Sequence, residues 1–215
     1  MIRHCPRMLM MIFMLISSTK AAVYSGQRPI WSILICTLDE RRAQFEKLRT
    51  AIQKQIDVAG LTEFVEICWI SDNRQMPTGT KRNLLLKQSR GEYVCFVDDD
   101  DALHDNYVRM IFEKLLKKPD CVNLIGIITF DGKNPKTFLH SIKYNNKYCE
   151  ENGVYYRPPN HLNPIKRSIA IQFPFPDIYI GEDAQWAQAI ARSGLLQREE
   201  IIDVPYYFYK YKSRK

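Results

Sequence analysis

The chain has 215 residues, of which 46% are hydrophobic and 26% are charged, and these values exclude a mainly disordered chain and fit one globular domain. The formal net charge of +7 is concentrated at the ends, because residues 1–30 and residues 205–215 each hold four basic residues and no acid. The remaining residues, 31–204, therefore carry a net charge of only −1. This distribution argues against nucleic acid as a partner, since a basic groove for nucleic acid would be spread over the folded body.

The first element along the chain is a short apolar segment, Met8–Ile16, which follows two arginines and precedes small polar residues. This outline is typical of a signal peptide, and the segment is too short for a transmembrane helix, which needs about 20 apolar residues. Three interpretations stay open: a secretion signal over residues 1–21, a membrane-surface anchor, or an extension that precedes the domain. We treat residues 1–28 as this separate segment and residues 29–215 as the folded domain.

The basic ends and the cysteines bear on the location of the protein. Aromatic residues accompany the basic residues near the C-terminus, a mixture that suits peripheral contact with an anionic membrane surface, with a solvated tail as the alternative. The six cysteines form no closely spaced pair of the kind that binds zinc, and a thiol inside an apolar run behaves as a small hydrophobic residue. We therefore expect a cytoplasmic location, with membrane association and export as open alternatives.

Strands alternate with helices along the first half of the domain. Continuous apolar runs predict strands that are buried on both faces, and apolar residues at helical spacing predict amphipathic helices. The predicted strands are Ser32–Leu38, Phe64–Ile70, Tyr93–Val97 and Val122–Phe130, and the predicted helices cover residues 40–56, 80–89 and 107–116. This order predicts an α/β sheet with right-handed crossovers.

The pattern changes after residue 130. Asp131-Gly132 and Asn152-Gly153 are hairpin signals. The segments around them predict short antiparallel strands and one late helix, with strands at Phe138–Tyr144, Val154–Arg157, Ile201–Val204 and Tyr206–Tyr211 and the helix at Glu182–Arg192. We expect one domain, in which a parallel half is followed by a smaller antiparallel β half.

Four consecutive aspartates, residues 98–101, follow the third predicted strand. In open α/β sheets, ligands bind at the carboxyl ends of the strands. Adjacent carboxylates repel one another unless a cation lies among them, and carboxylate oxygens suit Mg²⁺ or Mn²⁺, which bridge phosphate oxygens. The sequence therefore predicts a divalent metal, Mn²⁺ or Mg²⁺, with a solvated acidic loop as the alternative.

Three segments together resemble the family 2 glycosyltransferases of the GT-A fold. They are Thr80–Asn83, the run from Arg90 to Asp101, and Gly181–Trp186, and the resemblance spans Trp31 to Val204. It implies a GT-A fold, with a Rossmann-like nucleotide-binding half and a mixed central sheet before the smaller half that contacts the acceptor. It also implies a metal-dependent enzyme that moves a sugar from a nucleotide-diphospho-sugar to an acceptor hydroxyl by inverting single displacement, in surface glycan or polysaccharide biosynthesis.

The resemblance also implies roles for individual residues. The nucleotide-binding candidates are Thr37, Arg41, Asp72, Arg82 and Asp98. Among these, an arginine suits a diphosphate because its planar fork matches phosphate oxygens. The metal-binding candidates are Asp100, Asp98, Asp101 and His161, with Asp100 as the second acid of the Asp-x-Asp pattern.

The catalytic candidates are Asp183, as the base that takes the proton from the acceptor hydroxyl, and its neighbour Glu182. Both acids also have a simpler explanation, because carboxylates are favoured in the first turn of a helix. Trp186 is the candidate for a sugar or acceptor contact, with a position partly in the core as the other interpretation. The acceptor itself, a glycan, a lipid-linked saccharide or a protein, is expected to lie against residues 134–176.

Two other functions are compared with sugar transfer. A nucleotidyltransferase also places acids and a metal on an α/β sheet, but it should carry a glycine-rich phosphate loop after the first strand, and residues 37–42 contain no glycine. A binding domain that has lost its chemistry is the third alternative, and the two intact acidic motifs argue against it.

Overall fold

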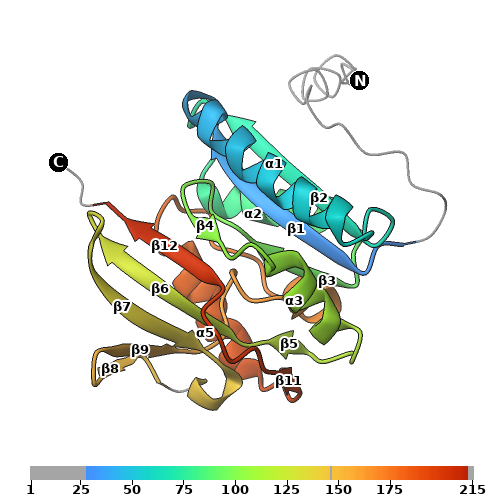
Figure 1. Cartoon of the computed structure of the whole chain (residues 1–215). Helices are drawn as coiled ribbons and strands as arrows, with labels where there is room; N and C mark the ends of the chain where they lie inside the picture. Colours follow the sequence, from blue (N-terminus) through green and yellow to red (C-terminus); the bar gives the residue numbers. More distant parts are fainter. Residues whose placement is uncertain (1–27, 146, 213–215) are drawn as a thin grey trace, which may run out of the picture.

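A computed structural model describes residues 28–145 and 147–212 (Figure 1). Residues 1–27, which hold the signal-like segment, lie outside the described residues, so the three interpretations of that segment stay predictions. In the described part of the chain, no helix is long and apolar enough to span a bilayer.

The first sheet has six strands in the order β11-β5-β10-β3-β1-β2. The long strand β1 (Trp31–Leu38) pairs in parallel with β2 (Val65–Asp72) and with β3 (Tyr93–Phe96), which confirms the predicted parallel half. The other three strands are short, and they are β5 (Cys121–Val122), β10 (Ile165–Lys166) and β11 (Glu199–Glu200). Because β10 runs antiparallel between β3 and β5, the sheet is mixed.

Helices cover both faces of this sheet. The helical segments are α1 (Arg42–Val58), α2 (Thr78–Gln88), α3 (Tyr107–Leu115), α4 (Arg167–Ala170) and α5 (Glu182–Ser193), with 3-10 turns η1 (Asp39–Arg41) and η2 (Ile142–Tyr144). Successive residues of a strand point to opposite faces, so Ile33 and Ile35 join the buried cluster formed with α1 and α3, whereas Leu34 joins the cluster formed with α2 and α5.

The second sheet also has six strands, in the order β4-β12-β6-β7-β9-β8. They are β4 (Ala102–Leu103), β6 (Leu124–Phe130), β7 (Lys133–His140), β8 (Cys149–Glu151), β9 (Val154–Arg157) and β12 (Tyr207–Tyr211). Both predicted hairpins are confirmed: Asp131 and Gly132 join β6 to β7, and Asn152 and Gly153 join β8 to β9. All four residues have positive φ, between 50° and 77°, as a tight turn between twisted strands requires.

The second half is not antiparallel throughout. β12 runs parallel to β6, and β9 runs parallel to β7. The reason is the path of the chain, since β9 returns to β7 after η2 and the β8 strand, and β12 is added to β6 from the C-terminal end of the chain. Figure 1 shows β12 lying between the green β4 and the yellow β6.

The predicted strand Val122–Phe130 is divided at Asn123 between the two sheets, as β5 and β6. The Asn123 side chain donates to the carbonyl oxygen of Ile202 (3.1 Å) and accepts from the Ile202 amide (2.7 Å). These two bonds stabilise the point at which the chain leaves one sheet for the other. The predicted strand Ile201–Val204 is wrong, because the pairing there ends with β11 at Glu200.

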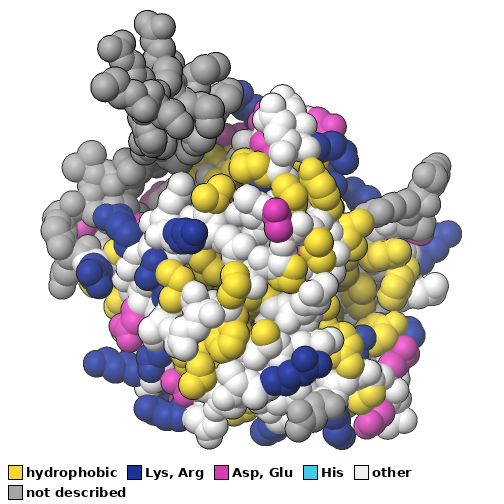
Figure 2. Space-filling view, turned by 180° about the vertical axis from the view of Figure 1, so that it is seen from behind, with side chains coloured by type: hydrophobic (Ala, Val, Ile, Leu, Met, Phe, Trp, Pro, Cys, Tyr) yellow, Lys and Arg dark blue, Asp and Glu magenta, His cyan; other side chains and the backbone are white. Residues whose placement is uncertain are grey.

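Charged side chains are dispersed over the surface of the described residues. Figure 2 shows Lys and Arg side chains scattered around the rear face, with hydrophobic side chains between them. This distribution agrees with the nearly neutral body calculated from the sequence. On the face drawn there, the basic side chains form no continuous stripe of the kind that a nucleic-acid groove presents.

Candidate active site

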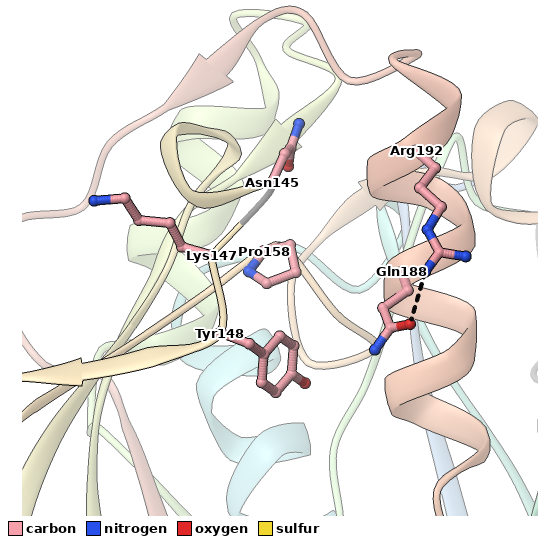
Figure 3. A pocket seen from close by; sticks show the side chains of 6 residues that line it. All are labelled: Asn145, Lys147, Tyr148, Pro158, Gln188 and Arg192. Carbon is pink, nitrogen blue, oxygen red and sulfur yellow. Dashed lines mark hydrogen bonds between the residues drawn. The ribbon is translucent and has the colours of Figure 1, made fainter.

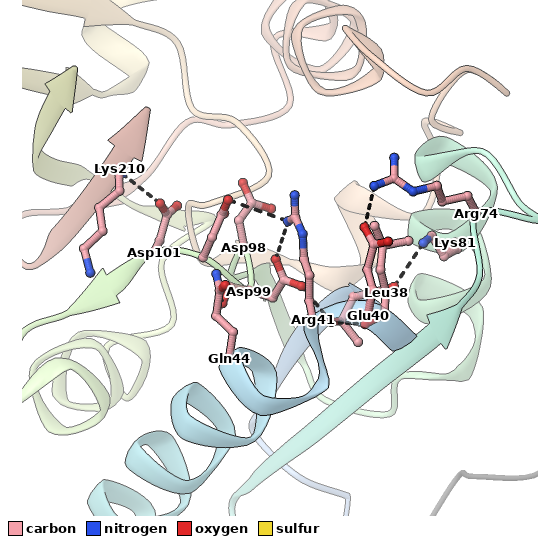
Figure 4. A network of polar contacts seen from close by, with 12 residues as sticks. Leu38, Glu40, Arg41, Gln44, Arg74, Lys81, Asp98, Asp99, Asp101 and Lys210 are labelled. Atoms are coloured by element: carbon pink, nitrogen blue, oxygen red, sulfur yellow. Dashed lines mark hydrogen bonds and ion pairs between the residues drawn. The ribbon is translucent and has the colours of Figure 1, made fainter. Parts of the chain in front are cut away.

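Asp99 joins the four consecutive aspartates (residues 98–101, the aspartate segment) to β1 and α1 by hydrogen bonds (Figure 4). Its carboxylate accepts hydrogen bonds from the Thr37 hydroxyl (2.6 Å) and from Arg41 (2.8 Å), and its carbonyl oxygen accepts from the Gln44 amide (3.2 Å). Asp99 is only 3% exposed. Two of the nucleotide-binding candidates, Thr37 and Arg41, are thus engaged with this aspartate at the carboxyl end of β1.

Asp101 is held by the last strand. One carboxylate oxygen accepts from the Tyr207 hydroxyl (2.7 Å) and the other from the Lys210 amide (3.0 Å). Burial, reinforced by the charge of Asp98, raises the pKa of Asp101 to about 8 despite these two donors. Since both oxygens accept hydrogen bonds in this arrangement, Asp101 attaches the aspartate segment to β12 and is not directed towards a ligand.

Asp98 and Asp100 differ from their two neighbours. Asp98 accepts from Arg82 (3.2 Å), and its other oxygen lies 3.5 Å from Nε2 of His161. Burial opposes the ionisation of Asp98, but Arg82 and His161 outweigh it and hold the pKa of this carboxyl well below its usual range. The Asp100 side chain is 25% exposed and lies 3.6 Å from Arg41. These two carboxylates are therefore the ones of the four that stay available to a ligand.

Arg82 is buried between two acids and two aromatic rings. Its Nε donates to Glu182 (3.1 Å) and its Nη2 to Asp98 (3.2 Å), while its guanidinium lies 4.8 Å from the Phe96 ring centre and 5.8 Å from that of Phe175. The third nitrogen, Nη1, is buried and has no hydrogen-bond partner. The structure thus places Glu182, one of the two catalytic candidates, in a buried ion pair with Arg82.

His161 joins the aspartate segment to the start of α5. Its ring is 4% exposed, and Nδ1 lies 3.6 Å from Asp183 while Nε2 lies 3.5 Å from Asp98. Neither ring nitrogen has a hydrogen-bond partner among the residues that the structure describes. The backbone at His161 is held against β3, because the His161 carbonyl accepts from the Phe96 amide (2.7 Å). An imidazole with two unsatisfied nitrogens between two carboxylates is suited to binding a cation or a substrate hydroxyl.

Asp183 is the more accessible acid of the Glu-Asp pair. It is the second residue of α5, which begins directly after Gly181, and the φ of 84° at Gly181 permits the tight turn into the helix. The Asp183 side chain is 36% exposed, in contrast to 5% for Glu182. A carboxylate in this position is stabilised by the helix N-terminus and can still reach a substrate.

Asp72 lies at the end of β2 in a second polar group. It forms a buried ion pair with Lys81 (2.7 Å) and accepts from the Met76 amide (2.8 Å), and Lys81 also donates to the Thr37 carbonyl (3.2 Å). Burial opposes the ionisation of Asp72, but Lys81 and the Met76 amide lower its pKa. Sequence reasoning assigned no role to Lys81. The available signal was its place in the Thr80–Asn83 segment, close in sequence to Asp72.

Trp186 does not lie at a ligand-facing surface. Its ring is 2% exposed, stacks on Phe175 at 4.6 Å with an interplanar angle of 8°, and donates through Nε1 to the Phe173 carbonyl (2.8 Å). The expectation of a sugar contact is therefore corrected: Trp186 packs in the core behind Arg82. Its burial follows from helical periodicity, because Ala187, Ile190 and Ala191 are buried on the same side of α5.

A cleft of about 420 Å³ lies between the acidic residues described above and the second sheet. Asp98, His161 and Asp183 lie at one side of it. The opposite wall comes from the second sheet and the loop before β8 and is rich in aromatic side chains, which are Phe130, Phe138, Tyr148, Tyr155, Tyr209 and Tyr211. The cleft thus combines acids with flat apolar surfaces, as a site for a hydroxylated ligand does.

His140, which carries no predicted role, also lines this cleft. It is 6% exposed, and Nδ1 lies 3.3 Å from the Asn163 amide oxygen. Burial lowers the pKa of His140 from 6.5 to about 4. Folding therefore favours the neutral ring.

We expect His140 to make the folded state sensitive to acid. Because its folded pKa is depressed, its contribution to the free energy of unfolding is complete above about pH 6.5 and is lost as the pH falls through 4, a change of roughly 3 kcal/mol. Denaturant unfolding of the wild type and of His140→Gln from pH 7.5 to pH 4 measures the effect. The difference in stability between the two proteins should shift in favour of the variant on acidification, and a constant difference would contradict the buried neutral ring.

Comparison with known proteins identifies the fold and the family. The model described as glycosyl transferase family 2 matches residues 66–176, just over half of the chain. That stretch includes Asp72, Arg82 and Asp98 but ends before Asp183. No curated protein matches the chain.

Crystal structures of Staphylococcus aureus TarS are similar in fold. Residues 1–349 of TarS give a TM-score of 0.55 at 15% identity, over 84% of this chain and 60% of that one. The same TarS fragment with UDP-GlcNAc gives a TM-score of 0.51 at 14% identity, over 86% and 59% of the two chains, and with UDP it gives 0.50 at 13% identity, over 84% and 60%. The described domain thus has the expected GT-A fold, and it spans about 60% of the TarS fragment it resembles.

Proposed function

This chain belongs to glycosyl transferase family 2, and we propose that it transfers a sugar from a nucleotide-diphospho-sugar to an acceptor hydroxyl, with inversion at the sugar, in surface glycan or polysaccharide biosynthesis. The observation that carries the proposal is the convergence of Asp98, His161 and Asp183 at one cleft, with His161 3.5 Å from the first acid and 3.6 Å from the second. The three residues come from separate segments. If His161 had only a structural role, its buried ring nitrogens would be expected to form hydrogen bonds, whereas neither does so among the described residues.

The donor would lie across the carboxyl ends of β1, β2 and β3. The fold supports this placement, because open α/β sheets bind nucleotides at that edge, and the similar TarS fragment has been crystallised with UDP and with UDP-GlcNAc. Thr37 and Asp72, joined through Lys81, form the polar floor at the ends of β1 and β2. Arg41, whose side chain is 41% exposed, is the guanidinium best placed to reach a phosphate there.

The donor set fits Mn²⁺ or Mg²⁺. Unlike Asp101, Asp98 and Asp100 do not have a strong hydrogen-bond donor at each of their two carboxylate oxygens. His161 has unsatisfied ring nitrogens. Among the described residues, no three such side chains are gathered closely enough to hold an ion by themselves. A Mg²⁺-type ion is commonly bound by one or two carboxylates together with substrate phosphates, so the two aspartates would hold the ion jointly with the donor.

Each residue then has a definite task. A bound divalent ion would supply charge neutralisation for the departing nucleoside diphosphate. Asp183 accepts the proton of the acceptor hydroxyl, and His161 orients the Asp183 carboxylate from 3.6 Å away. Glu182 holds Arg82 in place, and Arg82 holds Asp98, so we assign Glu182 a positioning role.

The test is hydrolysis of a panel of nucleotide-diphospho-sugars by the purified protein, with added Mn²⁺ or with EDTA. We expect hydrolysis of at least one donor, its loss in EDTA, and a fall of about a hundredfold or more in Asp100→Asn, because electrostatic stabilisation of the leaving group is a large part of the barrier. Asp105→Asn is the matched control, since Asp105 is exposed and outside the cleft. Metal-independent hydrolysis, or full activity in Asp100→Asn, would contradict the metal assignment.

A further inference from the structure

A second cavity continues the cleft along α5. It has a volume of about 280 Å³, and its walls come from the segment before β8, from Pro158 and from α5 (Figure 3). Tyr148 lines both this cavity and the cleft that contains Asp183. The two spaces therefore adjoin at Tyr148.

Two arginines line these two spaces, one in each. Arg157 lines the cleft, and its guanidinium lies 4.2 Å from the centre of the Tyr148 ring. Arg192 lines the second cavity, where it contacts the Gln188 amide oxygen at 3.3 Å. Within the described residues, neither arginine forms an ion pair with a carboxylate. Arg157 donates hydrogen bonds to the carbonyl oxygens of Cys149 and Tyr156.

The second cavity is lined by cationic and amide side chains and by no acid. Its lining residues are Asn145, Lys147, Tyr148, Pro158, Gln188 and Arg192. Among the described residues, the buried amide oxygen of Asn145 has no hydrogen-bond partner, and a buried acceptor of this kind favours a ligand that brings a hydroxyl donor. Guanidinium groups favour phosphate or carboxylate oxygens.

The helix sets the length of such a ligand. Asp183, Gln188 and Arg192 stand on α5, and at a rise of about 1.5 Å per residue the two later residues lie about 7.5 Å and about 13.5 Å along the axis from Asp183. A ligand that reacts beside Asp183 and also reaches Arg192 is therefore longer than one sugar ring.

From these observations we propose that the cleft and the second cavity form one acceptor track for an anionic oligosaccharide. The sugar rings lie on Tyr148, and the phosphate or carboxylate groups bind Arg157 and Arg192. The inference rests on the proposed function, since it specifies the acceptor of the same site.

The test measures binding of three tetrasaccharides without a donor: maltotetraose, its 6-phosphate, and tetragalacturonate. We expect both anionic probes to bind about tenfold or more tightly than the neutral one, and to weaken as salt is raised. Arg192→Gln and Arg157→Gln should remove this advantage for the anionic probes, and Tyr148→Ala should weaken all three. If only one anionic probe binds tightly, it identifies the anion as phosphate or carboxylate.

Arg109→Gln is the control, because it removes one positive charge from an exposed position on α3. Far-ultraviolet circular dichroism reports whether each variant is folded. Equal affinity for neutral and anionic probes, or anionic binding that Arg192→Gln and Arg157→Gln leave unchanged, would overturn the proposal. Binding of anionic lipid vesicles through Arg192 without any tetrasaccharide binding would overturn it as well.

The two proposals fail in different ways. Probe binding is measured without turnover, so anionic selectivity in a protein that hydrolyses no nucleotide-sugar would overturn sugar transfer, and the two cavities would then be a binding site for anionic oligosaccharides and no acceptor track. Conversely, donor turnover without anionic selectivity would overturn the track alone.

Discussion

Asp183→Asn is expected to lower sugar transfer by about a thousandfold, within the range found when a general base is removed. The amide cannot accept the acceptor proton, but it keeps the shape of the carboxylate and a hydrogen-bonding oxygen near Nδ1 of His161. Because Asp183 is partly exposed and Glu182 stays paired with Arg82, the fold and donor binding should persist. The measurements are transfer from a labelled nucleotide-sugar, the donor dissociation constant and the unfolding midpoint.

Two comparisons sharpen this experiment. Asp105→Asn makes the same chemical change at an exposed position outside the cleft and should transfer sugar at the wild-type rate. Glu182→Gln should lower the unfolding midpoint, because it removes a charge from the buried pair with Arg82. Wild-type transfer in Asp183→Asn would end the assignment of Asp183 as the base.

Arg82→Met is expected to cost about 3–5 kcal/mol of unfolding free energy, as the loss of one partner from a buried ion pair does. The Arg82 side chain is 6% exposed and the Glu182 side chain 5%. Methionine fills part of the space between Phe96 and Phe175, but it leaves the Glu182 carboxylate buried without its cation. Urea unfolding followed by circular dichroism gives the free energy.

The control for this prediction is Arg109→Met, since Arg109 forms an exposed pair with Glu113 on α3 and should contribute no more than about 0.5 kcal/mol. The double variant Arg82→Met/Glu182→Gln should recover part of the loss, because the uncompensated charge is then gone. A loss in Arg82→Met as small as that in Arg109→Met would show that the buried pair does not stabilise the fold.

The parallel half could be predicted from the sequence because its signals are local. An apolar run such as that of β1 and helical spacing such as that of α1 each lie within one window. The two hairpins were predictable for the same reason, since Asp131-Gly132 and Asn152-Gly153 specify their own turns. The direction of β9 and β12 was not, because strand pairing across the second sheet depends on the path of the intervening chain.

The acidic residues of the site could be predicted from the sequence, but the separate role of each residue could not. Four consecutive aspartates look alike in the sequence, and only contacts with distant segments distinguish them: Asp99 meets Thr37, and Asp101 meets Tyr207. The burial of Glu182 likewise depends on Arg82, a hundred positions away. Trp186 was the exception, because the apolar residues around it in α5 carried a local signal of burial.

The fastening of Asp101 by β12 has a consequence for how the protein matures on the ribosome. Tyr207 and Lys210 are among the last described residues to be synthesised, whereas the aspartates they hold emerge about a hundred residues earlier. Pairing between segments so far apart closes late in folding. A nascent chain can thus pair β1 with β2 and β3 and bond Asp99 to Thr37 and Arg41 while Asp101 still lacks the partners that β12 supplies, and the cleft gains its final shape only when β12 leaves the exit tunnel.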